Sequence, residues 1–221
     1  MKQNKWAVLS TALTLFLLCG CTASIAPSSQ HTVAIVAKST QTEFWLSVFA
    51  GAEAAATEYN VELIITGPKA EEDYETQNQM VANAVDAGAE ALVFSAIDYE
   101  NNAAAIDAAA QAGVQIVAID SNVASSAVST YIGTDNYAAG QMAAQSALDR
   151  ISGSLKVGII NYDISSANGQ EREQGAVDTF TQSGRAEIVG IVNTLAEASH
   201  AQSDTTALLE KYPQINVLLA F

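Results

Sequence analysis

Basic residues are scarce in this sequence. The chain has 9 Lys and Arg against 24 Asp and Glu, which gives a formal net charge of −15 over 221 residues. Proteins that bind nucleic acids draw much of their affinity from clustered Lys and Arg that neutralise phosphates. The composition therefore argues against a nucleic-acid partner and favours a self-repelling acidic surface.

Residue patterns typical of enzymes and metal sites are also missing. The sequence has no G-x-x-x-x-G-K-[ST] loop, no G-x-G-x-x-G after its first apolar run, no H-E-x-x-H and no G-x-S-x-G. Its two histidines, His31 and His200, are far apart in the chain, and no Cys, His and Asp cluster has metal-site spacing. We therefore expect neither catalysis, nor a metal, nor a cofactor.

Cysteine is nearly absent, and both cysteines stand near the N-terminus. Cys19 and Cys21 follow an apolar run over 7–18, which Lys2 and Lys5 precede. The run has the length of a secretory signal and is too short to cross a membrane as a helix. A buried hydrophobic helix with incidental cysteines is the alternative interpretation.

The four residues 18–21, LCGC, resemble the bacterial lipobox, in which the last cysteine is lipidated and becomes the mature N-terminus. We therefore expect a lipoprotein signal peptide over 1–20, lipidation at Cys21 and a small, polar tether over 21–31. In that case the mature chain has no disulfide and no free thiol. The lipid would hold the protein at the outer face of a membrane.

Short apolar runs alternate with amphipathic segments from residue 32 onwards. The runs are rich in β-branched residues, as buried strands are, and the segments between them repeat apolar residues every three or four positions, as helices do. Gly88 and Gly113 each end an expected helix before the next strand. The expected strands are 32–37, 61–65, 91–95, 115–119, 130–132, 155–160, 187–192 and 217–221, and the expected helices are 44–56, 74–87, 101–112, 136–151, 168–182 and 200–212. This alternation predicts an α/β fold with mostly parallel sheets.

The pattern restarts after Gly133, which indicates two domains. We expect an N-terminal lobe over 32–134 and a C-terminal lobe over 135–221. The last apolar run reaches Phe221 without a following helix. A buried parallel strand needs cover on both faces of its sheet, so we expect the second lobe to be incomplete and the chain to be a fragment.

Polar side chains follow most of the expected strands. Each group alone is typical of a turn or a helix cap. Parallel strands, however, bring their carboxyl ends to one edge of a sheet, where ligands bind in open α/β folds. The groups are residues 39–43, Ser95 with Asp98, 120–122, 134–136 and 162–170. Together they predict a polar cleft between the two lobes.

Phe44 and Trp45 lie at the entrance of the first helix, beside this edge. Asp, Asn, Gln and Ser supply the donors and acceptors that hydroxyl groups need, and the C–H face of a sugar ring packs against a flat aromatic ring. The combination favours a sugar-like ligand. The alternative for one of the two aromatics is that it only packs the helix onto the sheet.

Four motifs occur in order along residues 32–221: EFW at 43–45, VAIDSN at 117–122, YIGTDN at 131–136 and QEREQG at 170–175. In these motifs the chain resembles the periplasmic sugar-binding protein family, type I, which includes ribose-binding proteins and relatives of the LacI repressor. The resemblance implies two Rossmann-like lobes joined by a hinge, with a sugar or a related small molecule bound between them. It also implies that an ABC permease and its ATPase receive the ligand.

The resemblance also implies ligand-binding positions. The aromatic pair matches the ring-stacking residues, and Asp120 matches the carboxylate that accepts from sugar hydroxyls. The full set is Gln41, Phe44, Trp45, Ser95, Asp120, Thr134 and Gln170. Ser121 and Gln170 stand where ribose binders carry arginines, so the family resemblance does not identify ribose. Arg172 is interpreted as structural.

We therefore expect an extracytoplasmic solute-binding protein, not an enzyme, that captures a sugar for an ABC importer. A lipid anchor would place it at the outer face of the cytoplasmic membrane or in the periplasm. A sensory receptor of the same fold, signalling to a membrane kinase or chemoreceptor, is the first alternative. The effector domain of a repressor would need a helix-turn-helix where the signal segment stands. An enzyme ranks last, since a fold alone does not assign function.

Overall fold

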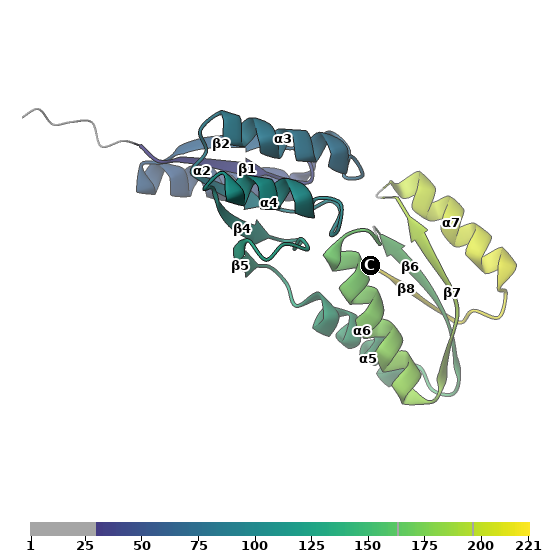
Figure 1. Ribbon diagram of the computed structural model, residues 1–221. Helices are drawn as coiled ribbons and strands as arrows, with labels where there is room; N and C mark the ends of the chain where they lie inside the picture. The colour runs from purple at the N-terminus through teal and green to yellow at the C-terminus, as the bar shows by residue number, and fades with distance from the viewer. Residues whose placement is uncertain (1–29, 163, 196) are drawn as a thin grey trace, which may run out of the picture. The chain divides into compact units, whose positions relative to one another are not determined.

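The strands form two separate parallel sheets, each with helices packed on it (Figure 1). The computed structural model describes residues 30–162, 164–195 and 197–221. The expected signal peptide, the lipidation site at Cys21 and most of the expected tether lie outside these residues. Residues His31–Phe221 form one compact unit.

Helices and strands alternate as the sequence predicts. The elements are β1 (Thr32–Val36), α2 (Glu43–Tyr59), β2 (Glu62–Thr66), α3 (Tyr74–Asp86), β3 (Ala91–Phe94), α4 (Ala103–Gln111), β4 (Gln115–Ile119), β5 (Val128–Ile132), α5 (Asn136–Arg150), β6 (Leu155–Tyr162), α6 (Ala167–Ser183), β7 (Ala186–Thr194), α7 (Ala198–Lys211) and β8 (Val217–Ala220). The expected α/β fold with parallel sheets is confirmed.

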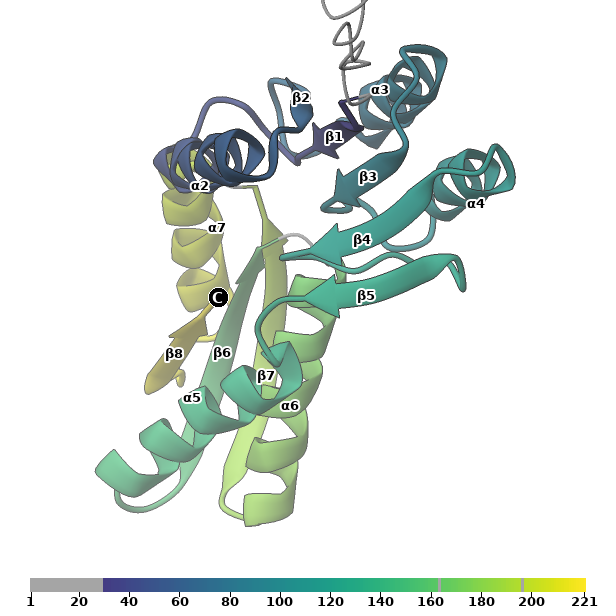
Figure 2. The same cartoon turned by 90° about the vertical axis from the view of Figure 1, so that its left-hand side faces the viewer.

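The first sheet has the strand order β2-β1-β3-β4-β5, and all of its pairs are parallel. Successive side chains of a strand point to opposite faces, so this sheet builds two cores. Ala34 and Val36 of β1 pack with α3 and α4 on one face. Ile35 and Ala37 pack with Trp45 of α2 on the other face. Figure 2 shows α2 on one side of this sheet and α3 and α4 on the other.

The second sheet has the order β7-β6-β8, again parallel. Val157 and Ile159 of its central strand pack with α5 and α6. On the opposite face, Gly158 and Gly190 lie under Leu208 of α7. Because β6 is buried on both faces, it reads as a nearly continuous apolar run.

Side chains cap the helices whose N-termini face the strand ends. Thr42 accepts a hydrogen bond from the backbone of Trp45 at the start of α2, at 3.4 Å. Asp135 caps α5 and Ser166 caps α6 in the same way, at 2.9 and 3.1 Å. Each cap satisfies a backbone N–H group that the helix leaves without an internal partner. The caps also fix where each loop ends.

Two differences from the expected bounds affect the site. β6 continues to Tyr162, because Tyr162 still pairs with Thr194 of β7, whereas the sequence placed Tyr162 in the following loop. β5 begins at Val128, two residues before the expected start, through its pairing with β4. The predicted lobes, 32–134 and 135–221, follow the division into two sheets and are called the first and second lobes below. Their boundary stays a prediction.

Candidate functional site

A cavity of about 330 Å³ lies where loops from both lobes meet. Lys38 and Asp120 follow β1 and β4 of the first lobe, and Tyr162 ends β6 of the second. The cavity therefore forms at the carboxyl ends of parallel strands, as is usual for ligand sites in open α/β sheets. Its lining residues are Lys38, Thr42, Phe44, Trp45, Glu71, Asp120, Tyr162, Ser166, Asn168, Gly169 and Arg172.

The two aromatics differ in burial although they are neighbours. Phe44 is 56% exposed, whereas Trp45 is 1% exposed and belongs to the core beneath α2. Their rings meet edge to face, with centroids 5.0 Å apart, and the Trp45 ring stacks on Phe49 at 6.2 Å. Phe44 thus offers the cavity an accessible ring, and Trp45 supports it from below.

Asp120 is held in an unusual backbone conformation. Its φ is +57°, in the left-handed region that few residues other than glycine adopt. The Tyr131 hydroxyl donates to the Asp120 carbonyl at 2.7 Å, and the Asp120 N–H donates to the Ile132 carbonyl at 3.0 Å. Strained residues of this kind cluster at functional sites.

The Asp120 carboxylate receives one hydrogen bond from each lobe. Ser95, which is fully buried, donates to Oδ2 at 3.0 Å, and Asn168 donates to Oδ1 at 3.3 Å. An ionised carboxylate has about four acceptor positions. Asp120 is therefore oriented by two donors and keeps acceptor capacity for a ligand in the cavity.

In the second lobe, a chain of side chains continues from this carboxylate. The buried Asn136 donates to Asn168 Oδ1 at 3.2 Å and accepts from Arg172 Nε at 2.8 Å. Its amide orients the Asn168 side chain, whose own amide points to Asp120. Arg172 also lines the cavity. Its side chain therefore holds Asn136 in place and is also part of the cavity wall.

A buried glutamine fixes the loops that follow two strands of the first lobe. The Gln77 amide, on α3, donates to the carbonyls of Ala37 at 3.0 Å and Ser95 at 2.9 Å. Its Oε1 accepts from the Ile97 backbone at 3.1 Å. These bonds hold the ends of β1 and β3, and with them the positions of Lys38 and Ser95.

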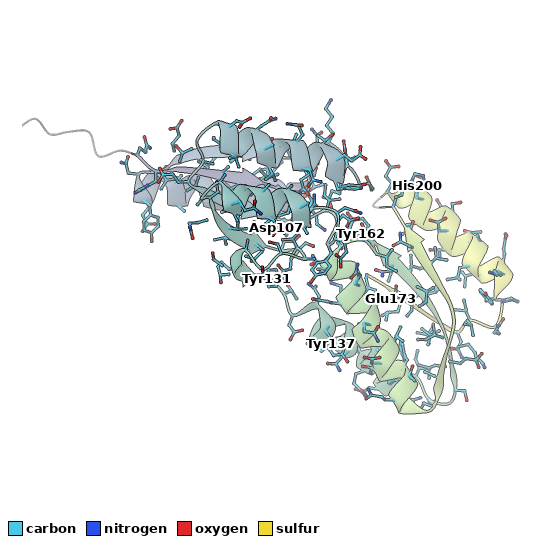
Figure 3. The ribbon with its side chains drawn as sticks, in the orientation of Figure 1. Asp107, Tyr131, Tyr137, Tyr162, Glu173 and His200 are labelled. Atoms are coloured by element: carbon cyan, nitrogen blue, oxygen red, sulfur yellow. The ribbon has the colours of Figure 1, made fainter. Side chains whose placement is uncertain are left out.

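Further hydrogen bonds join the two lobes. The Tyr162 hydroxyl donates to Glu71 Oε2 at 2.7 Å, and Glu71 Oε1 accepts from the Trp45 indole N–H at 3.3 Å. The backbone of Tyr99 donates to the Ser165 carbonyl at 2.8 Å. Figure 3 labels Tyr162 where side chains from the two lobes come together.

Acidic groups lie close together where β5 leads into α5. Partial burial, and then the nearby Asp135 carboxylate, raise the pKa of Glu171 above its ordinary value. Burial also raises the pKa of Tyr131, with contributions from Glu171 and Asp120 that Arg172 opposes. Burial and the neighbouring carboxylates thus both disfavour a further negative charge in this region.

The structure brings three of the predicted site residues to the cavity: Phe44, Trp45 and Asp120. Ser95 lies behind them and reaches the site through Asp120. Gln41, Thr134 and Gln170 are exposed and do not line the cavity. The Gln170 amide donates to the Ile164 carbonyl at 2.9 Å. The ligand-binding roles of all seven residues stay predictions.

The ligand-binding positions that the sequence predicts do not include the other lining residues. Tyr162 and Asn168 lie in a polar segment that the sequence singled out as a whole. For Arg172 the sequence favours a structural role. Glu71 had no signal, because it lies in an acidic loop after β2 that the strand pattern treats as a turn.

Within the described parts of the chain, no group of three or more His, Cys, Asp or Glu is arranged to hold a metal ion. Across those same residues, no helix is both long and apolar enough to span a membrane.

Comparison with known proteins places the chain in a family. Residues 33–221 match the family described as periplasmic binding protein domain. The chain belongs to this family. The resemblance to type I periplasmic sugar-binding proteins is thereby confirmed.

Individual relatives support the same family assignment. The D-ribose/D-allose-binding protein of Pseudomonas aeruginosa is 27% identical over 97% of the chain and 69% of its own length. A carbohydrate transporter solute-binding protein from Agrobacterium radiobacter, solved with D-arabinose, has a TM-score of 0.81 at 27% identity, over 87% of this chain and 67% of its own. A solute-binding protein from Agrobacterium vitis with bound D-fucose has a TM-score of 0.79 at 26% identity, over 85% and 66%. The chain thus spans about two thirds of the length of these relatives.

Proposed function

We propose that this chain is the ligand-capturing part of an extracytoplasmic solute-binding protein, and that it binds a monosaccharide or a similar polyhydroxylated molecule. The observation that carries the proposal is the cavity in which Phe44 and Trp45 lie beside Asp120. An aromatic ring packs against the C–H face of a sugar, and an oriented carboxylate accepts from its hydroxyls. Relatives with bound D-arabinose and D-fucose support the same ligand class.

The lining charges support a neutral ligand. Lys38 and Arg172 are balanced by Glu71 and Asp120 among the described residues of the cavity wall. A strongly anionic ligand, such as a sugar phosphate, needs an excess of cationic donors or a helix N-terminus free to bind it. Ser166 already caps the nearby α6. A neutral sugar or polyol therefore suits the site better than a phosphorylated one.

The mechanism we propose is closure of the two lobes around the ligand. Asp120 belongs to the first lobe and Asn168 to the second, so a ligand that contacts both stabilises the closed arrangement. A ligand shifts such an equilibrium only by its differential affinity for the two states. An ABC permease would then recognise the closed form and accept the ligand.

The cellular setting follows from the family and from the N-terminal sequence. The periplasmic family supports an extracytoplasmic location. The LCGC motif supports attachment to the outer face of a membrane through lipidated Cys21. We propose a binding protein without catalytic activity.

A thermal-shift panel on the full chain tests the ligand class. The panel contains D-ribose, D-arabinose, D-allose, D-fucose, myo-inositol, their phosphates where available, amino acids and nucleosides. We expect a concentration-dependent rise in Tm with at least one neutral sugar, because a ligand of the folded state stabilises it. Stabilisation by another class, with none by any sugar, would overturn the sugar proposal.

Asp120→Asn tests whether the carboxylate recognises the ligand. Asn tolerates the left-handed backbone conformation, so the variant should fold. Hydrogen bonds to a charged group are worth about 1.5–3 kcal/mol, so we expect the Kd of a stabilising sugar to rise about 10- to 100-fold. Glu58→Gln, an exposed acid on α2 that does not line the cavity, is the control. An unchanged Kd in Asp120→Asn, measured by calorimetry, would remove Asp120 from the site.

A further inference from the structure

We propose that Glu71 and Tyr162 form a latch that sets ligand affinity by fastening the closed lobes to each other. This inference rests on the proposed function, because it assigns the pair a role in ligand retention. The latch consists of the 2.7 Å hydrogen bond from the Tyr162 hydroxyl to Glu71 Oε2. Its two members are 91 positions apart in the chain and come from different lobes.

The Glu71 side chain is anchored to the core of its own lobe. Its second oxygen accepts from the indole N–H of Trp45 at 3.3 Å. Trp45 is 1% exposed and packs among Ile35, Ala37 and Phe49. Because the Glu71 carboxylate is bonded to the buried ring of Trp45, it cannot move with the second lobe when the two lobes separate. Opening therefore breaks the bond to Tyr162.

The partner residue is equally fixed. Tyr162 is the last residue of β6, the central strand of the second sheet, and pairs with Thr194 of β7. β6 carries Val157 and Ile159 into the core beneath α5 and α6. The hydroxyl position thus follows the second lobe as a whole, and the latch links two rigid bodies.

The latch differs from the other side-chain bond across the cavity, between Asn168 and Asp120. An amide and a carboxylate at 3.3 Å are groups whose contact a ligand hydroxyl can replace, since it both donates and accepts. In the latch, the hydrogen bond from Tyr162 is shorter, at 2.7 Å, and the Glu71 carboxylate is also anchored to the buried indole of Trp45. The latch is therefore retained when a ligand replaces the contact at Asp120.

A bond of this kind, made only when the lobes are closed, slows ligand release. Its loss favours the open state, so the apparent affinity falls with the closed population. Because opening precedes dissociation, most of the effect belongs in koff. Since the latch does not recognise the ligand, its loss should raise koff by the same factor for every sugar that binds.

The kinetic test compares three variants of the full chain. Tyr162→Phe removes only the hydroxyl, and Glu71→Gln weakens the acceptor. Tyr137→Phe is the matched control, because the Tyr137 hydroxyl donates to the Asp178 carboxylate at 2.8 Å entirely within the second lobe. Figure 3 places Tyr137 along α5, away from Tyr162.

Stopped-flow binding of D-arabinose, D-allose and D-fucose supplies the rates. For each sugar that binds, we expect Tyr162→Phe to raise koff about tenfold, equivalent to about 1.4 kcal/mol, with kon within about twofold of wild type. Glu71→Gln should give a smaller rise and Tyr137→Phe none. If the rise in koff of Tyr162→Phe differed between sugars, the Tyr162 hydroxyl would have to contact the ligand. That result would overturn the latch.

A second measurement needs no ligand. Small-angle X-ray scattering of the sugar-free protein should give a larger radius of gyration for Tyr162→Phe than for wild type or Tyr137→Phe. The double variant with Glu71→Gln should show no further increase. Equal radii in all variants would overturn the latch. If no sugar binds in the panel, the proposed function fails, and scattering still decides whether the two residues hold the lobes together.

Discussion

Neighbouring residues on one helix turn perform different tasks at this site. Successive residues of an α-helix are rotated by about 100°, so Phe44 and Trp45 cannot face the same surroundings. The ring of Trp45 enters the core of the first lobe, while the ring of Phe44 stays 56% exposed at the cavity. The residue whose ring is exposed at the cavity and the residue that supports it are thus adjacent in sequence.

Alanine substitutions separate these two roles. Truncating a buried tryptophan costs about 3–5 kcal/mol, so Trp45→Ala should lower the free energy of unfolding by that amount. Phe44→Ala should change it by less than about 1 kcal/mol, since much of the ring is exposed, yet should weaken sugar binding at least fivefold. Urea unfolding and calorimetry on the full chain check both quantities.

Leu46→Ala is the control, because Leu46 is 55% exposed on the same helix and does not line the cavity. It should leave both the unfolding free energy and the Kd close to wild type. Sugar affinity that survives Phe44→Ala unchanged would contradict a stacking role for this ring.

The sequence predicts some site residues better than others, for a physical reason. Asp120 directly follows β4, and Phe44 and Trp45 begin the helix that follows β1, so the parallel strands bring all three to one edge of the sheet whatever the rest of the chain does. That Glu71 and Arg172 line the same cavity depends on how the lobes meet. Periodicity describes a residue's own element and carries no information about a partner in the other lobe, such as Tyr162.

At the scale of elements, the crossing of α5 and α6 determines where the second-lobe side chains lie. A Cβ added at Gly140 would meet the Arg172 carbonyl oxygen at 2.0 Å, and one added at Gly175 would meet the Tyr137 carbonyl oxygen at 2.1 Å. The two helix backbones are therefore in direct contact. Because Asn168 and Arg172 stand on α6, this contact also sets where they lie in the cavity wall.

Gly175→Ala should separate the two helices. Overpacking a close contact costs about 1–3 kcal/mol, so we expect a loss of unfolding free energy in that range. Sugar affinity should fall as well, because Arg172 and Asn168 move with α6. Gly51→Ala is the matched control: Gly51 lies inside α2 with open space around its Cα, and alanine there should stabilise by about 0.4–1 kcal/mol. A Gly175→Ala variant as stable as wild type would contradict the close crossing.

The order of elements was predictable, whereas this crossing was not. Strand and helix periods are local, and the apolar runs from 32–37 to 217–221 mark the strands without reference to one another. A glycine inside a helical pattern, such as Gly175, could equally be an exposed position like Gly51. Only the packed structure distinguishes the two.

At the scale of the whole molecule, the two lobes have separate cores. One set of apolar residues surrounds β1, β3 and β4, and another surrounds β6. The side-chain bonds described between the lobes, Asp120 with Asn168 and Glu71 with Tyr162, both stand at the cavity. The state of the cavity therefore contributes to how firmly the lobes are joined.

Hydrogen exchange measured with and without sugar tests this coupling. A ligand that contacts both lobes should slow exchange of the amides at 42–46 and at 166–172 together, with the same dependence on sugar concentration, because one closing event protects both segments. Amides on the outer part of α7, at 202–210, do not line the cavity and should exchange at unchanged rates. Protection confined to one lobe would mean that the sugar binds without bridging, and closure would then play no part in its capture.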